Sequence, residues 1–358
     1  MTTLLLALIL QDVDPARINK AIDDGAKYLI HRVEAGTVNS KPKTTGGPSE
    51  EDLLKDELLL YALIYAGVDE KNEQYQKTLK LVLESKLEST YRVSIQAMAL
   101  EVLDATKYQG RIAQCGQFLI DNQCENGTWT YGKEVPVDAW TPNESGGDGT
   151  KGRKQIVLKK RSKGPATGDA SNAQYAILGL KACMVADVVI PLEVFAAAEK
   201  SWLTTQQKDG GWHYGSATKT RTEHSYGTMT AGGASSLAIC KYYLKKEYKK
   251  DPAIAKACEW LAANLSVTTH PKFDWKTPGH GWFHYWLFAL ERAGILCERE
   301  KLGTHDWYQE GAKQLVEAQG RDGAWDGDRD KLTNTCFAIL FLRKAVKPLK
   351  PVATESGK

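Results

Sequence analysis

The chain has 358 residues, of which 42% are apolar and 25% are charged, and its formal net charge is +3. This composition is ordinary for a folded globular protein and excludes collagen-like, mucin-like and disordered classes. No stretch approaches the roughly 20 apolar residues that a membrane-spanning helix needs, so we expect a chain that does not span a membrane. The net charge is too small to predict a nucleic acid partner. The seven cysteines include no Cys-x-x-Cys pair, so neither disulfides nor zinc knuckles are expected to hold the fold.

The amino terminus carries a short apolar run. Residues 4–10 read LLLALIL, the minimum length for the apolar core of a signal peptide, although no basic segment or clear small-x-small cleavage site flanks them. We interpret residues 1–14 as a signal or an N-terminal extension, and favour an exported, periplasmic location over a cytoplasmic one. A strand or helix packed on the body is the alternative.

Two kinds of helical segment alternate along the rest of the chain, and internal repetition of this kind governs the fold prediction. One kind is amphipathic and carries an aromatic–leucine pair, with copies at Tyr28-Leu29, Phe118-Leu119, Trp202-Leu203 and Trp260-Leu261. The other kind is apolar almost throughout. Its six copies span residues 57–67, 93–103, 171–182, 230–242, 281–294 and 333–345.

A turn with glutamine, glycine and tryptophan recurs three times. Its copies are Gln123-x3-Gly127-x-Trp129, Gln207-x2-Gly210-x-Trp212 and Gln319-x3-Gly323-x-Trp325. Glycine permits a tight turn, and the large tryptophan rings are expected to fill gaps between helices.

The two kinds of helix together predict a closed ring. A helix that is apolar on every side must be buried on every side, whereas an amphipathic helix can cover it. Their alternation gives hairpins with an inner and an outer helix, and neighbouring hairpins must stack to bury the inner ones. We therefore predict an all-α fold, an α/α toroid of about six helical hairpins over residues 15–346 with a central cavity. Residues 347–358 are expected to be a flexible tail.

The Gln-x(2–3)-Gly-x-Trp pattern resembles the QW motif of the prenyltransferase and squalene-cyclase repeat family. The aromatic–leucine helices and the apolar helices beside it fit the same family, so the resemblance covers residues 15–346. It implies a small, bacterial-type toroid like those of terpenoid cyclases and protein prenyltransferases. The activities of the family carry over only where its catalytic residues are present.

Three chemistries known for toroids of this kind lack their residues here. Cyclases of the family protonate an alkene with an Asp-x-Asp-Asp acid, and no such sequence occurs. The Cys-Gly-Glu-Gln thioester of complement-type toroids is replaced by Cys115-Gly-Gln-Phe118. The zinc ligands of prenyltransferases fall on His280, Trp282 and Asn334, of which only His280 could bind the metal. No cofactor is evident, and zinc is not expected.

Polar residues gather where the predicted inner helices begin. In a closed ring these helices run parallel, and their N-terminal ends, with free N–H groups, meet at one mouth. The candidate cavity residues are Arg92, Asp169, Asn172, Gln174, Tyr226, Thr230, His280, Trp282, His284 and Asn334. Helix capping is the alternative for the Asp, Asn and Thr side chains, but it explains Arg92, Gln174 and His284 less well.

Asp169, His280 and His284 are the candidate catalytic residues. The two histidines are one helical turn apart and share a face. With Asp169 they could form a two-histidine, one-carboxylate metal site, and histidines satisfied within an aromatic layer are the alternative. No third ligand is fixed by the sequence, so no metal site is assigned.

Residues 133–168 interrupt the repeat and are too long for an idle connector. Between residues 151 and 163 they carry seven basic residues and no acidic one. Residues 155–158 could form a strand. Their place before an inner helix predicts a basic flap beside the cavity mouth that could attract an anionic ligand, with a solvated loop as the alternative.

The retained scaffold and the missing signatures together predict a function. We expect a toroid that diverges from the catalytic members and binds an apolar, isoprenoid-like molecule or a peptide segment in its cavity. An anionic small molecule is also a candidate partner. One alternative is an isoprenoid cyclase or transferase with a displaced acid, for which Asp169 is the leading carboxylate. The other is a carbohydrate-active α/α toroid.

Overall fold

The computed structural model describes residues 12–35, 55–136, 154–215, 224–273, 281–327 and 329–349. These ranges form twelve helices and two short strands. The apolar run at residues 4–10, His280 and residues 350–358 lie outside the described residues, and so do the expectations that rest on them.

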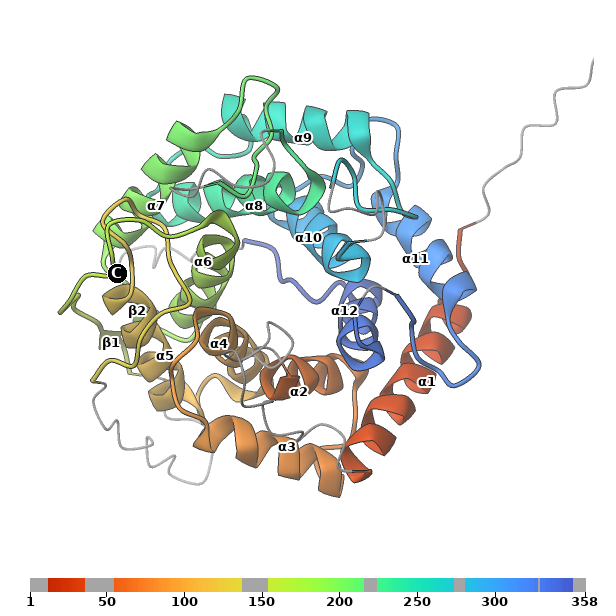
Figure 1. Cartoon of the computed structure of the whole chain (residues 1–358). Helices are drawn as coiled ribbons and strands as arrows, with labels where there is room; N and C mark the ends of the chain where they lie inside the picture. Colours follow the sequence, from red (N-terminus) through yellow and green to blue (C-terminus); the bar gives the residue numbers. More distant parts are fainter. Residues whose placement is uncertain are drawn as a thin grey trace, which may run out of the picture.

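Six helices surround the centre of the molecule, and six more lie outside them (Figure 1). The inner helices are α2 (Lys55–Ala66), α4 (Thr90–Asp104), α6 (Ala170–Val185), α8 (Gly227–Tyr243), α10 (Phe283–Leu296) and α12 (Lys331–Arg343). The outer helices are α1 (Pro15–Glu34), α3 (Glu73–Glu84), α5 (Gln109–Asp121), α7 (Leu192–Thr205), α9 (Pro252–Asn264) and α11 (Trp307–Ala318). Each predicted apolar segment coincides with one inner helix, so the predicted α/α toroid is confirmed. Within the described ranges, no helix combines the length and the apolar character needed to cross a membrane.

Burial follows the two sequence patterns. Each inner helix contacts the next one, and α12 contacts α2, which closes the inner ring. Every residue of α8 from Gly227 to Lys241 is buried, as an apolar helix inside a ring requires. The outer helix α1 buries one stripe that includes Ile18, Ile22 and Leu29. The aromatic–leucine pairs mark α1, α5, α7 and α9, whereas α3 and α11 lack such a pair.

The glutamine–glycine–tryptophan turns fasten neighbouring outer helices to one another. In the turn after α5, the side-chain amide of Gln123 donates to the carbonyl oxygen of Val194 in α7 at 2.9 Å. The indole N–H of Trp129 donates back to the carbonyl oxygen of Leu119 in α5 at 2.7 Å. The turn therefore bonds to its own helix and to the next one.

The second turn corrects the predicted motif. The amide of Gln206, not that of Gln207, donates to the carbonyl oxygens of Gly210 and of Ala253 in α9, both at 2.8 Å. Gln207 donates instead to the carbonyl oxygen of Thr205. The assignment of Gln207 is wrong, and all three turns share the spacing Gln-x3-Gly-x-Trp.

The third turn joins the last outer helix to the first. The amide of Gln319 donates to the carbonyl oxygen of Ala21 in α1 at 2.7 Å, and the indole N–H of Trp325 donates to that of Leu315 in α11 at 2.8 Å. The outer ring is thus closed by the same hydrogen bonds that connect its neighbours elsewhere.

The inserted segment takes a different course from the predicted one. The expected strand exists as β1 (Ile156–Val157), which pairs in parallel with β2 (Val188–Val189). Since β2 follows the C-terminal end of α6, β1 lies at the end of the ring opposite to the predicted mouth. The chain then runs along α5, where Asp121 accepts the backbone N–H groups of Arg161 and Ser162. The strand therefore does not lie beside the mouth, whereas Lys160 bonds to Gln123 at the end of α5 that is nearest to the start of α6.

The turn glycines provide a direct test of the outer ring. Gly323 has a φ of +82°, and a Cβ atom there would lie 2.5 Å from the carbonyl oxygen of Asp24 in α1. Gly67 has a φ of +75° with no atom within 4 Å of such a Cβ, so it is the matched control. We expect Gly67→Ala to cost about 1 kcal/mol of unfolding free energy, and Gly323→Ala about 3 kcal/mol, because strain and collision add. Urea denaturation followed by circular dichroism measures both, and equal losses would contradict this account.

Candidate functional site

The first turns of the inner helices meet at one end of the ring. The hydroxyl of Tyr91 in α4 donates to Oγ of Ser171 in α6 at 2.6 Å. The amide of Gln174 in α6 donates to the hydroxyl of Tyr285 in α10 at 2.9 Å. Because both bonds join residues near helix N-termini, these helices run parallel and their starts form one rim. We call the inside of the inner ring, from this rim to the opposite end, the lumen.

An aromatic layer lies inside this rim and consists of Tyr91, Tyr175, Tyr285, Phe288 and Phe337. Neighbouring ring centroids are 4.9 Å apart for Tyr91 and Tyr175, and 6.0 Å apart for Tyr175 and Tyr285. Phe337 lies 5.5 Å from Tyr285 and 5.6 Å from Phe288. Tyr91 and Tyr285 are partly exposed, and the other three are buried. Four inner helices, α4, α6, α10 and α12, thus contribute rings to one layer.

A fully buried arginine is packed against this layer. The guanidinium carbon of Arg292 lies 4.8 Å from the ring centroid of Phe288, 5.2 Å from that of Tyr175 and 5.7 Å from that of Tyr285. Its Nη2 donates to Oε1 of Gln174 at 2.8 Å. Its Nε and Nη1 are buried without a hydrogen-bond partner, and no ion pair with a carboxylate is found for it among the described residues. The aromatic faces interact favourably with the cation, but they do not neutralise its charge.

The preceding residue, Glu291, holds the C-terminal segment. Its Oε1 accepts the backbone N–H of Val346 at 2.9 Å, and its Oε2 is buried without a partner. Burial raises the pKa of Glu291 to about 8, so this carboxyl group is protonated at neutral pH. The hydroxyl of Tyr61 in α2 donates to the carbonyl oxygen of Ala345 at 3.3 Å. Residues 344–349 therefore contact α2 and α10 at the end of the lumen opposite to the rim.

A small cavity lies beside this C-terminal segment. Its volume is about 20 Å³, which is room for about one water molecule. Its walls include Tyr65, Leu178, Lys181 and Val346. Burial lowers the pKa of Lys181 to about 8. Among the described residues, this hollow beside the C-terminal segment holds no more than about one water molecule.

Two of the predicted cavity residues have structural partners. Nε of Arg92 lies 3.1 and 3.0 Å from the two carboxylate oxygens of the buried Glu57, which ties α4 to α2. Oγ1 of Thr230 accepts the backbone N–H of Trp212 at 3.1 Å, which fixes a turn tryptophan to α8. Both side chains hold helices in place.

Asp169 and Asn172 form a helix cap. Oδ1 of Asp169 accepts the backbone N–H of Asn172 at 2.7 Å, and Oδ2 accepts its side-chain amide at 2.8 Å. This is the N-cap arrangement that the sequence analysis kept as the alternative. The pair starts α6 at the rim, so it positions the aromatic layer below it.

The start of α8 is organised by a histidine that the sequence did not single out. His270 is buried, and its Nε2 accepts the backbone N–H of Thr228 at 3.1 Å while Nδ1 lies 2.7 Å from the carbonyl oxygen of Gly281. Burial lowers its pKa to about 3, so the imidazole is neutral. The ring of the predicted residue Tyr226 packs against it at 5.5 Å.

The remaining candidates line the rim between α10 and α12. Trp282 precedes α10 in a left-handed conformation with a φ of +61°, and the guanidinium carbon of Arg329 lies 3.2 Å from its ring centroid. The amide of Asn334 donates to the carbonyl oxygen of Arg329 at 2.9 Å. His284 is buried beside Gly327, where an added Cβ would lie 3.2 Å from its ring. The predicted partner of His284, His280, lies outside the described residues.

The described residues contain no group of three His, Cys, Asp or Glu side chains that could hold a metal ion. The hypothesis of a two-histidine, one-carboxylate metal site depends on His280. Because His280 lies outside the described residues, this hypothesis stays a prediction. Asp169 is occupied by its cap to Asn172.

Arg292 and Glu291 were missed by the sequence analysis. Besides His284, they are the acidic and basic residues of the segment 281–294, which is otherwise almost entirely apolar. A charged pair within an inner-ring helix is expensive to bury, and this is the signal that could have identified them.

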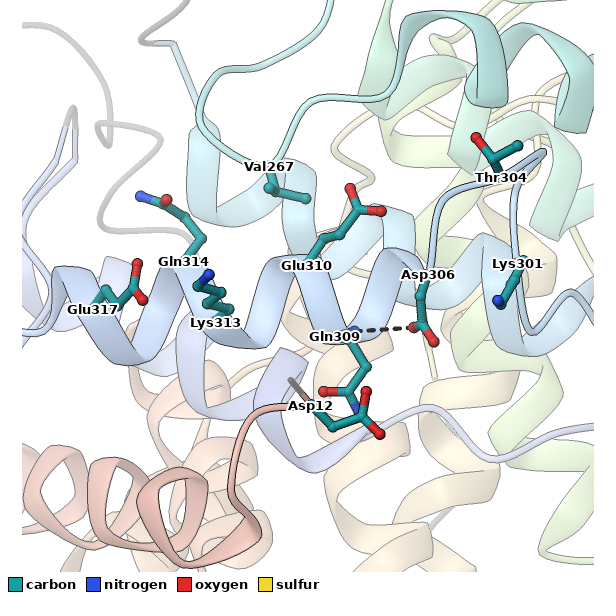
Figure 2. A pocket seen from close by; sticks show the side chains of 10 residues that line it. All are labelled: Asp12, Val267, Lys301, Thr304, Asp306, Gln309, Glu310, Lys313, Gln314 and Glu317. Atoms are coloured by element: carbon teal, nitrogen blue, oxygen red, sulfur yellow. Dashed lines mark hydrogen bonds between the residues drawn. The ribbon is translucent and has the colours of Figure 1, made fainter. Parts of the chain in front are cut away.

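A second hollow lies on the outer surface along α11 (Figure 2). Its volume is about 420 Å³, and its lining residues are Asp12, Val267, Lys301, Thr304, Asp306, Gln309, Glu310, Lys313, Gln314 and Glu317. The lining mixes both signs of charge and includes a single aliphatic side chain. It lacks the apolar walls and convergent polar groups typical of a ligand site, so the lumen is the better candidate.

The fold places the chain in the class of α/α toroids, with an architecture similar to that of type II terpene cyclases. It is similar to the apo structure of the type II terpene cyclase MstE from Scytonema, at 12% identity and a TM-score of 0.52, over 92% of this chain and 99% of that one. A variant of that cyclase in complex with its substrate, geranylgeranyl dihydroxybenzoate, matches with a TM-score of 0.53 at the same identity, over 92% and 97% of the two chains. No family model and no curated protein matches the sequence. At this identity the likeness shows the fold alone.

The buried carboxyl group predicts a pH dependence of stability. Because the pKa of Glu291 is raised from 4.5 to about 8 in the folded state, the native protein retains a proton that the unfolded chain releases, and stability falls as the pH rises through that window. Glu291→Gln keeps the acceptor for Val346 without the titration. We expect the unfolding free energy of the wild type, relative to this variant, to fall by about 4.5 kcal/mol between pH 4 and pH 9.

Urea denaturation at several pH values measures this difference. The exposed Glu259, changed to Gln, is the matched control. A difference between wild type and Glu291→Gln that does not vary with pH would contradict the assignment of a protonated Glu291.

Proposed function

We propose that this protein binds an apolar, isoprenoid-like molecule in its lumen. The observation that carries the proposal is the aromatic layer, in which four inner helices present rings to one another just below the rim. Aromatic faces bury large areas of apolar ligand, and the partly exposed Tyr91 and Tyr285 lie at the entrance side of the layer. The similar toroid of an MstE variant has been solved in complex with geranylgeranyl dihydroxybenzoate, which supports the choice of ligand class.

The residues at the rim favour binding over the reactions of related toroids. Asp169 is engaged as a helix cap, and Asn334 stands where prenyltransferases have a zinc-binding histidine. The chain contains no Asp-x-Asp-Asp sequence. The chain therefore has the toroid fold without the residues that catalyse alkene protonation in cyclases or bind zinc in prenyltransferases.

A matched pair of tyrosines tests where the ligand binds. Tyr285 lies in the aromatic layer, and Tyr308 lies in the outer helix α11, where its hydroxyl donates to the carbonyl oxygen of Leu342. Both are half-buried and make one hydroxyl hydrogen bond. We expect Tyr285→Leu to weaken the binding of geranylgeraniol about tenfold and Tyr308→Leu to leave it unchanged, because only the first removes a lumen ring.

Titration followed by tryptophan fluorescence measures both affinities, and thermal unfolding checks that both variants fold. Equal loss of affinity in the two variants would contradict binding in the lumen. A wild type that does not bind geranylgeraniol would contradict the proposed ligand class, and a copurified peptide would then favour the peptide-binding alternative.

A proton-donating enzyme is the second candidate, and one observation favours it. The carboxyl group of Glu291 is protonated at neutral pH inside the toroid, which is the state that an alkene-protonating acid needs. In such a reaction the proton adds to one alkene carbon, and a second proton leaves a neighbouring carbon of the resulting cation.

Deuterium labelling tests this second candidate. With geranylgeraniol in D₂O, we expect an isomerised or cyclised product with one deuterium, which Glu291→Gln abolishes and Asp169→Asn retains, since Asn also caps a helix. Mass spectrometry of the extracted lipid detects the label. A complete lack of deuterated product would exclude the enzyme reading for this substrate, and loss in Asp169→Asn alone would make Asp169 the acid.

A further inference from the structure

The guanidinium group of Arg292 is a buried positive charge in the lumen, and no ion pair is found for it among the described residues. Arg292 is fully buried, and its Nη2 donates to Oε1 of Gln174 at 2.8 Å. Nε and Nη1 have no partner among the described residues. An isolated buried charge costs several kcal/mol, and an arginine cannot shed its proton to avoid that cost. A counter-anion from outside the chain would relieve the penalty.

The side chains around the guanidinium group of Arg292 fix its orientation but do not neutralise its charge. Gln174 is held from its other side, since its amide donates to the hydroxyl of Tyr285 at 2.9 Å, and this chain of bonds fixes the guanidinium plane. The neighbouring carboxyl group of Glu291 bonds to Val346 in the C-terminal segment and forms no ion pair with Arg292.

A second donor lies beside the arginine. The hydroxyl of Tyr175 is buried without a hydrogen-bond partner, and its ring centroid lies 5.2 Å from the guanidinium carbon of Arg292. Two guanidinium nitrogens and one hydroxyl without a partner thus belong to neighbouring side chains in an apolar setting. Donors of this kind recognise a carboxylate or a phosphate group.

We infer that the lumen takes an amphiphile whose anionic head group, a carboxylate or phosphate, bonds to Arg292 and Tyr175, while its apolar body packs against the aromatic layer. This inference rests on the proposed function and specifies the chemistry of the ligand. Arg292 lies seven residues beyond Tyr285 along α10, about two helical turns deeper than the rim. The head group therefore enters first, and the apolar body lies toward the rim.

Two lipids of equal chain length test the head-group requirement. We expect the wild type to bind geranylgeranoic acid at least tenfold more tightly than geranylgeraniol at pH 7. Arg292→Met removes the charge and keeps apolar volume, so it should reduce the ratio of the two affinities to about one. Arg343→Met at the end of α12, where the guanidinium bonds to Asn19 outside the inner ring, is the matched control and should retain the preference.

Thermal unfolding without ligand gives an independent readout. Replacing a buried, unpaired charge by an apolar side chain removes a desolvation penalty, so Arg292→Met is expected to melt at a higher temperature than the wild type. A lower melting temperature would show that the charge is compensated within the chain and would overturn the inference.

The outcomes separate this inference from the proposed function. Binding of both lipids with equal affinity would overturn the head-group inference and leave apolar binding standing. Stabilisation by inorganic phosphate alone, without preference for the acid, would assign the site to a free anion and also overturn it. Failure of the wild type to bind either lipid would overturn the proposed function as well.

Discussion

The fold depends on hydrogen bonds between neighbouring outer helices. A helix that is apolar all round cannot be solvated, so the six inner helices need an unbroken outer cover. The glutamine–glycine–tryptophan turns provide it at three joints, between α5 and α7, between α7 and α9, and between α11 and α1. The last joint connects elements about 300 residues apart in sequence, and it turns a row of hairpins into a closed ring. Every feature of the lumen follows from that closure.

A closed ring of helices creates a buried interior, where a charged side chain is destabilising unless it is neutralised or paired. Glu291 satisfies the constraint by remaining protonated and by holding the C-terminal segment across the end opposite to the rim. Arg292 has no such option, because its charge is permanent. Glu291 thus contacts the C-terminal segment at the end opposite to the rim, and Arg292 places a positive charge beside the aromatic layer. An amphiphilic ligand would therefore bind in one orientation, with its anionic head group at Arg292.

The sequence predicted the architecture better than the site. Hydrophobic periodicity reports burial, so the six apolar segments located the inner helices and the toroid. Polarity at a helix start does not distinguish capping from ligand binding, so Asp169 and Thr230 were placed in the cavity although they hold helices and turns. Gln174 contacts Arg292 as a lumen residue, but Arg292 itself was hidden in a segment counted as apolar. The sequence likewise could not distinguish Gln206 from its neighbour Gln207 as the motif glutamine, because only the fold shows that the amide of Gln206 bonds to α9.

The central claim is that the lumen holds an apolar or amphiphilic ligand, and native mass spectrometry of the gently purified full chain tests it most directly. The account predicts a reproducible added mass that organic solvent removes and that Tyr285→Leu diminishes. An anionic lipid among the released molecules would agree with the unpaired guanidinium of Arg292. A protein that carries no added mass, and acquires none when incubated with isoprenoid alcohols or acids, would contradict the account.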